Sequence, residues 1–191
     1  MKVVIDTNSL LSLVRYYLPF DKKSILFEFI KEKISQGEII IIDKVLEECS
    51  YIAKGLVVRT LSYLEDKPFM KAAKLPHKTE FLLAPAPSKF LRQVENQFVN
   101  TVVRKQRKLT DTEFENQKNN FLNGADIKQI ILCLNYLKDG EETVLVSEET
   151  ESSNDNKLFM KIPAICKELA IPTMTLPQLL DSYDGIDIHF R

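Results

Sequence analysis

Four short apolar segments of the chain have the pattern of buried β-strands, because β-branched residues cluster in them and polar or turn-forming residues bound them. These segments are KVVID (2–6), EIIIID (38–43), ETVLVS (142–147) and IPTMTL (171–176). The segments between them have the spacing of helices. Strands that alternate with helices predict a parallel α/β sheet.

One of the helical segments, residues 24–35, places its apolar side chains on one face, and Gly37 follows in the position expected just past a helix C-terminus. Asp43 is expected to cap a helix that runs from Lys44 into the sixties. Gly124 is expected to precede another helix, over residues 125–138. Further helices are predicted over residues 9–17, 88–121, 162–170 and 177–183.

The length of 191 residues suits one domain with a hydrophobic core, and the composition of 45% hydrophobic and 28% charged residues is that of an ordinary globular protein. We therefore expect a single domain over residues 1–191. The N-terminus lacks the pattern of a secretory signal, and no apolar run of membrane-spanning length occurs. These features predict a cytoplasmic protein without a membrane partner.

Cysteine and histidine residues are too few and too scattered for a zinc site. Cys49, Cys133 and Cys166 lie far apart within apolar segments, and only His77 and His189 could join them. We therefore expect three buried, reduced thiols.

Charge is unevenly distributed along the chain. Residues 67–108 contain ten Lys and Arg residues against Glu80 and Glu95, a local balance of +8 in a chain of net charge −1. Prolines mark a loop within this segment, and a polar helical stretch follows. We expect a basic helical insert over about residues 67–121, which either contacts a polyanion or is a solvated helical face.

Acidic residues stand where two of the predicted strands end. Asp6 ends the first strand, and Glu148 and Glu149 follow the third. Ligands of open parallel sheets bind outside the carboxyl ends of the strands, although an acid in such a position can also be a simple helix cap.

Two further acids lie at the flank of an apolar helical face. At 100° per residue, Glu47 points away from the apolar face of its helix, whereas Glu48 lies at the border between core and water. Asp126 lies at a similar border in the first turn of its own helix, where a negative charge also interacts favourably with the helix dipole. Glu48 and Asp126 are therefore the functional candidates on these helices.

Four carboxylates at one sheet edge repel one another unless a cation neutralises them. Oxygen ligands without His or Cys select Mg²⁺ or Mn²⁺. Such a cluster suits metal-dependent hydrolysis of a phosphodiester.

The order of these motifs resembles that of PIN-domain ribonucleases, the class of the VapC-type toxins and the flap endonucleases. VVIDTNSLL (3–11) is similar to the opening motif of the family, and KVLEE (44–48) to the helix that carries its second acid. GADIKQIILCL (124–134) resembles the third motif and LVSEE (145–149) the fourth. Residues 154–180 resemble the C-terminal segment of an uncharacterised bacterial PIN subgroup.

This resemblance implies a PIN-like three-layer α/β/α fold, with a mostly parallel central sheet of four or five strands and a helical insert. It also implies an RNA endonuclease that uses Mg²⁺ or Mn²⁺, with an antitoxin protein and a homodimer as further partners. The catalytic residues that it implies are Asp6, Glu48, Asp126 and Glu149, of which Asp6, Asp126 and Glu149 are metal ligands.

Four basic residues and two polar ones complete the expected site. Asn8 and Ser147 would support the acids by hydrogen bonds, and the phosphate contacts would come from Arg104, Lys105, Arg107 and Lys108. The fourth acid is Glu149 where the family commonly has Asp, so Glu148 and Asp155 stay open as alternatives.

Other classes of protein fit less well. A non-catalytic PIN scaffold that binds nucleic acid or a protein would keep the fold without cleavage. A haloacid-dehalogenase-like phosphatase also has an Asp after its first strand, but it needs a second Asp where this chain has Asn8. A receiver-type signalling domain places its acids after different strands.

Overall fold

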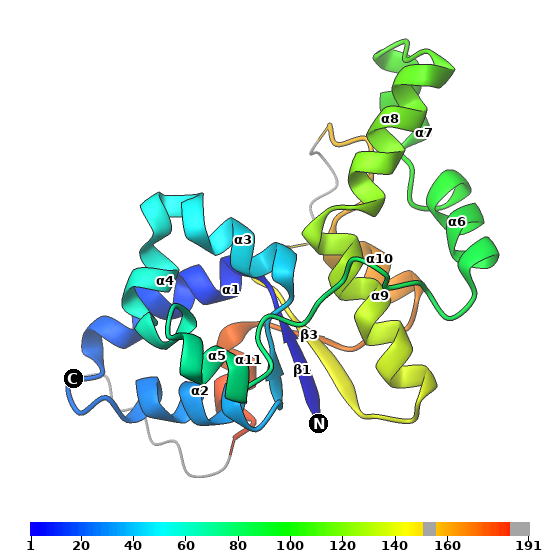
Figure 1. Ribbon diagram of the computed structural model, residues 1–191. Helices are drawn as coiled ribbons and strands as arrows, with labels where there is room; N and C mark the ends of the chain where they lie inside the picture. The colour runs from blue at the N-terminus through cyan, green and yellow to red at the C-terminus, as the bar shows by residue number, and fades with distance from the viewer. Residues whose placement is uncertain (151–155, 184–191) are drawn as a thin grey trace.

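A sheet of four parallel strands, in the order β2–β1–β3–β4, forms the centre of the computed structural model, which describes residues 1–150 and 156–183 (Figure 1). Val3 pairs with Ile39 on one side and with Val144 on the other. The strands are β1 (Lys2–Ile5), β2 (Ile39–Ile40), β3 (Thr143–Val146) and β4 (Thr173–Met174). The parallel α/β sheet is therefore confirmed, and all four strands lie within the predicted segments.

The chain leaves β1 toward β2 on one side of the sheet and later returns to β3 on the other side. The carboxyl ends of β1 and β3 therefore form a topological switch point, the place where ligands of open α/β sheets bind.

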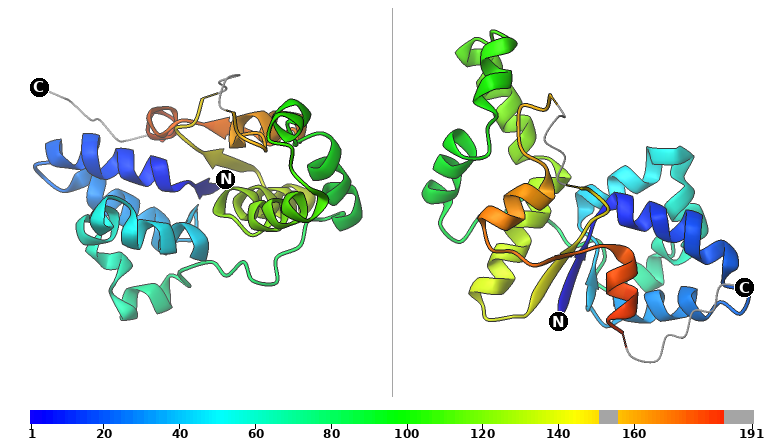
Figure 2. Two further views of the ribbon diagram at one scale, coloured as in Figure 1. Left: turned by 90° about the horizontal axis from the view of Figure 1, so that it is seen from above. Right: turned by 180° about the vertical axis from the view of Figure 1, so that it is seen from behind.

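Helices cover both faces of this sheet. Helix α9 (Ala125–Lys138) packs against β1 and β3 with α10 (Ile162–Glu168) beside it, whereas α11 (Leu176–Asp181) lies on the opposite face (Figure 2). The three-layer α/β/α arrangement is thus confirmed. The start and end of α9 are also as predicted, with Gly124 in the N-cap position.

The first half of the chain contains short helices on the side of the sheet next to β2. The α-helices are α1 (Thr7–Ser12), α2 (Ile25–Ser35), α3 (Asp43–Tyr51), α4 (Leu56–Thr60) and α5 (Lys67–Ala72). A π-helical turn η1 (Leu13–Tyr17) continues α1, and the 3₁₀ turns are η2 (Leu18–Phe20), η3 (Ile52–Gly55) and η4 (Ser62–Leu64).

The helix expected from Lys44 into the sixties is wrong, because the chain breaks after α3. Ala53, Lys54 and Gly55 all have left-handed φ angles, which end the helix and redirect the chain into α4. At Gly55 a Cβ atom would stand 2.9 Å from the carbonyl oxygen of Ser50, so the turn needs glycine there. The predicted end of α2 is confirmed, since Gly37 follows it with φ +67°.

A segment that we call the strap, residues 73–86, runs from α5 along the edge of the sheet and then over to α9 (Figure 1). His77 pairs in parallel with Ile42 beyond β2. Asp43 is the first residue of α3 and not its N-cap; its carboxylate accepts hydrogen bonds from the backbone N–H and hydroxyl of Thr79 at 3.0 and 2.6 Å. Asp43 therefore anchors the strap as well as starting α3.

Three helices, and not the one expected over residues 88–121, form an arm that projects beyond the carboxyl ends of the strands (Figures 1 and 2). The arm consists of α6 (Pro87–Asn96), α7 (Thr101–Gln106) and α8 (Asp111–Leu122). Asn100 caps α7, and Thr110 starts α8 with a capping box. These caps stabilise new helix starts where the polar pattern alone suggested continuity.

The arm is joined to the body by apolar packing. Phe159, from the segment between β3 and α10, stacks on Phe121 of α8 with ring centroids 4.2 Å apart and lies beside Phe114. The buried apolar side chains of the sheet and of the arm belong to one continuous cluster. The three cysteines are buried and unpaired, as expected. No helix in the described ranges is long and apolar enough to cross a membrane.

Candidate active site

Asp6 lies directly after β1 at the switch point and is only 3% exposed. Gln129 of α9 donates a hydrogen bond from Nε2 to Oδ1 of Asp6 at 3.3 Å. The backbone N–H of Asn8 donates to Oδ2 at 3.4 Å, so Asp6 also caps α1. Asn8 thus contacts Asp6 through its backbone, whereas its side chain is exposed. These donors favour the ionised carboxylate, but burial, together with the charge of Glu149, raises the pKa of Asp6 overall.

Glu48 reaches the same region from the second turn of α3. Its Oε2 accepts a hydrogen bond from the hydroxyl of Thr7, the residue after Asp6, at 2.5 Å. Glu47 is exposed and Glu48 partly buried, so the helical angles predicted the orientation of both side chains. The Thr7 bond orients the second acid toward the element that carries the first.

Asp126 lies in the first turn of α9. Burial and the charges of Asp6, Glu149 and Glu48 raise the pKa of this carboxyl group to about 7. A helix N-terminus ordinarily favours an ionised acid, so a raised pKa is the opposite of what simple helix capping produces. The four predicted acids therefore belong to one electrostatic cluster.

The two glutamates after β3 have different partners. Glu148 accepts a hydrogen bond at 2.7 Å from the backbone N–H of Leu176, the first residue of α11, and so ties that helix to β3. Glu149 accepts from the N–H of Ile162 at 3.3 Å, and its own N–H donates to the hydroxyl of the buried Ser147.

The charge of Glu149 is among the causes that raise the pKa values of Asp6 and Asp126, and that of Glu148 is not among them. The electrostatics thus favour Glu149 over Glu148 as the fourth acid. The other alternative, Asp155, lies outside the described residues.

The chemistry of these donors fits a hard divalent cation, because all four are carboxylates. Within residues 1–150 and 156–183, however, no three His, Cys, Asp or Glu side chains are arranged to hold a metal ion. Glu48 and Glu149 are each hydrogen-bonded to a protein donor, to Thr7 and to Ile162. The cluster therefore offers suitable ligands, while their present orientation does not enclose an ion.

The four cations predicted to contact phosphate lie on the arm, and two of them have intramolecular partners. Arg104 forms an ion pair with Asp111 at 3.1 Å and lies 3.8 Å above the ring of Phe114. Arg107 donates to the carbonyl oxygen of Asn156. Lys105 and Lys108 are exposed. Arg104 thus joins α7 to α8 within the arm, Arg107 ties the arm to the segment that follows β3, and the two lysines present their charge to solvent.

Sequence reasoning did not identify Thr7, Gln129 or Lys157 as parts of the site. Gln129 had a signal, since it is a polar residue that falls among the apolar positions of α9 and is fully buried. Thr7 follows Asp6 directly but became relevant only when β1 and α3 were brought together. No sequence pattern indicated Lys157, because its position beside Glu149 depends on contacts with the arm.

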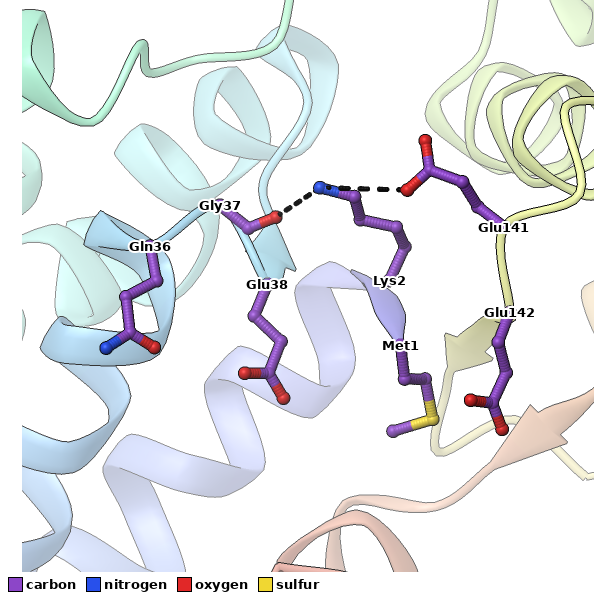
Figure 3. Close-up of a pocket in the computed structure, with 7 residues that line it drawn as sticks. All are labelled: Met1, Lys2, Gln36, Gly37, Glu38, Glu141 and Glu142. Carbon is purple, nitrogen blue, oxygen red and sulfur yellow. Dashed lines mark hydrogen bonds and ion pairs between the residues drawn. The ribbon is translucent and has the colours of Figure 1, made fainter.

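A different cavity, of about 360 Å³, lies at the amino ends of the strands (Figure 3). Lys2 crosses it and contacts the carbonyl oxygen of Gly37 at 3.0 Å and Glu141 at 3.9 Å. The lining residues are Met1, Lys2, Gln36, Gly37, Glu38, Glu141 and Glu142. This open surface hollow lies at the end of the sheet opposite the acids, so it is not part of the candidate site.

Comparison with known proteins identifies one family. Neither curated proteins nor solved structures gave a significant match. Residues 78–185, more than half of the chain and from within the strap to beyond α11, match a domain of unknown function, DUF4411. The match includes Asp126 and Glu149, whereas Asp6 and Glu48 lie before it. The chain therefore belongs to the DUF4411 family.

Proposed function

We propose that the protein is a Mg²⁺- or Mn²⁺-dependent endoribonuclease with a PIN-like site. The observation that carries this proposal is the convergence of four acids from four separate elements at the switch point, with the pKa of Asp126 raised to about 7 by burial and by its acidic neighbours. Such uncompensated repulsion costs stability, and a bound cation would remove it.

In this mechanism Asp6, Asp126 and Glu149 would hold the cation, and Glu48, oriented by Thr7, would accept the proton of the water that displaces the leaving oxygen. A divalent ion at such a site supplies charge neutralisation for the phosphodiester and its leaving oxygen. Gln129 keeps Asp6 in one orientation. Lys105 and Lys108 of the arm bind backbone phosphates of the RNA.

RNA as substrate, a cytoplasmic location, an inhibitory antitoxin and a homodimer come from the resemblance to VapC-type PIN proteins. They belong to the proposal for that reason alone. The acid cluster itself supports phosphodiester hydrolysis without selecting the nucleic acid.

The test is cleavage of single-stranded RNA in Mn²⁺ or Mg²⁺ by four variants. Asp6→Asn, Glu48→Gln and Asp126→Asn should each reduce the rate at least about 100-fold, since each removes a group at the reacting centre. Glu47→Gln is the matched control, because Glu47 neighbours Glu48 but is exposed. Full activity of Asp6→Asn or Asp126→Asn would contradict the nuclease proposal.

A non-catalytic scaffold is the second candidate. It is favoured by the observation that, among the described residues, no three potential ligands already surround an ion position. This alternative predicts RNA binding that is independent of Mn²⁺ and no cleavage by the wild-type protein.

A further inference from the structure

The backbone around Lys157 is clamped by the arm on both sides. Arg107 of the arm donates a hydrogen bond to the carbonyl oxygen of Asn156. The backbone N–H of Asn100 donates to the carbonyl oxygen of Leu158 at 2.7 Å. Val99 and Phe159 form an antiparallel bridge, and Met160 donates to the carbonyl oxygen of Phe98 at 2.8 Å. Polar and apolar contacts of the arm therefore fix the segment in which Lys157 lies.

The side chain of Lys157 points from this clamped segment to the acids. Its Nζ stands 3.8 Å from Oε1 of Glu149, and its charge acts favourably on the ionised form of Asp126. The Lys157 side chain is nevertheless 58% exposed, against 18% for Glu149. Its ammonium group thus lies at the boundary between the acid cluster and solvent.

A contribution to the stability of the fold does not account for the position of Lys157 beside Glu149. An ion pair at 3.8 Å with one largely exposed partner contributes little to folding. Lysine is, however, a compact point charge on a flexible stem and a common ligand of phosphate. A mobile cation beside a carboxylate cluster can neutralise either the acids or an incoming phosphate.

We propose that Lys157 binds a non-bridging phosphate oxygen of the substrate at the acid cluster, and that the arm serves to position it. This inference deepens the proposed function and rests on it for the identity of the substrate. It assigns the arm a role in building the site, in addition to the phosphate contacts of its exposed lysines. It also makes Lys157 a competitor of the divalent cation for the charge of Glu149.

The experiment compares Lys157→Gln with Lys138→Gln, which removes a charge from the far, exposed end of α9. Binding of a short single-stranded RNA is measured in an Asp6→Asn background, where cleavage does not interfere. Binding of Mn²⁺ alone is measured by calorimetry with Asp6 intact. We expect Lys157→Gln to weaken RNA binding about tenfold, the effect of losing one charged hydrogen bond.

The affinity for Mn²⁺ should stay equal or rise in Lys157→Gln, because a competing cation has gone. A surface lysine without a role would leave both affinities as in Lys138→Gln, and a merely structural lysine would lower both together with thermal stability. Either result overturns the inference. If the wild-type protein does not cleave RNA but Lys157→Gln still weakens its binding, the nuclease proposal fails and the phosphate site stands. If the Asp6→Asn protein binds no RNA, the inference fails as well.

Discussion

The Asp126 carboxylate is placed against its own electrostatic preference. A group whose pKa rises from 3.8 to about 7 on folding keeps a proton that the unfolded chain releases. Between about pH 4 and pH 7 the folded state therefore binds more protons than the unfolded state, and stability falls as pH rises through this window. Above pH 7 the full penalty of the ionised carboxylate remains.

Asp126→Asn should consequently stabilise the metal-free protein, by roughly 1–3 kcal/mol at pH 8, because the amide carries no charge. The gain should shrink as the pH is lowered and should approach zero only below the unfolded-state pKa of 3.8, where Asp126 becomes protonated in both states. Urea unfolding in EDTA at pH 5, 6.5 and 8 measures this dependence. A gain that is equal at all three values would mean that charge repulsion is not its cause.

At the scale of elements, the structure agreed with the sequence where apolar periodicity decided the outcome. Helix α9 and the strands β1, β2 and β3 follow from continuous apolar patterns, and the flank positions of Glu48 and Asp126 follow from helical angles. These are local properties of a chain whose apolar face must be buried.

The features that the sequence did not predict depend on backbone geometry or on contacts between distant segments. Ala53 and Lys54 adopt left-handed φ angles, although neither residue type favours them, so the end of α3 had no signal before Gly55. The place of Lys157 beside Glu149 depends on contacts with the arm, which is distant in sequence. A pattern along one chain does not contain that information.

Phe159 joins the arm to the body, and removal of its ring should destabilise the packing between them. Its ring is 9% exposed and packs on Phe121 and Phe114, so Phe159→Ala should lower the free energy of unfolding by about 3 kcal/mol or more. Phe81→Ala is the control, because Phe81 is 87% exposed and should change stability by less than about 0.5 kcal/mol. Equal losses in the two variants, measured by urea unfolding, would contradict the proposed anchoring.

On the scale of the whole molecule, opposite charges are separated in space within a chain of net charge −1. The carboxylates gather at the carboxyl edge of the sheet, and the arm that carries Lys105 and Lys108 projects beyond that edge (Figure 1). A polyanion that approached the acids alone would be repelled. Exposed cations on a neighbouring element offset this repulsion over a range set by the ionic strength.

The double variant Lys105→Gln/Lys108→Gln tests this arrangement, because both side chains are exposed and their loss should leave the fold intact. If each lysine contacts one phosphate, the variant should show a weaker salt dependence. The slope of log affinity for single-stranded RNA against log salt should become less negative by about 1.4, or about 0.7 for each contact. Arg104→Gln should behave differently: it removes the ion pair with Asp111 and the contact with Phe114, so the arm should lose stability. An unchanged salt slope in the lysine variant would show that the basic arm is a solvated face.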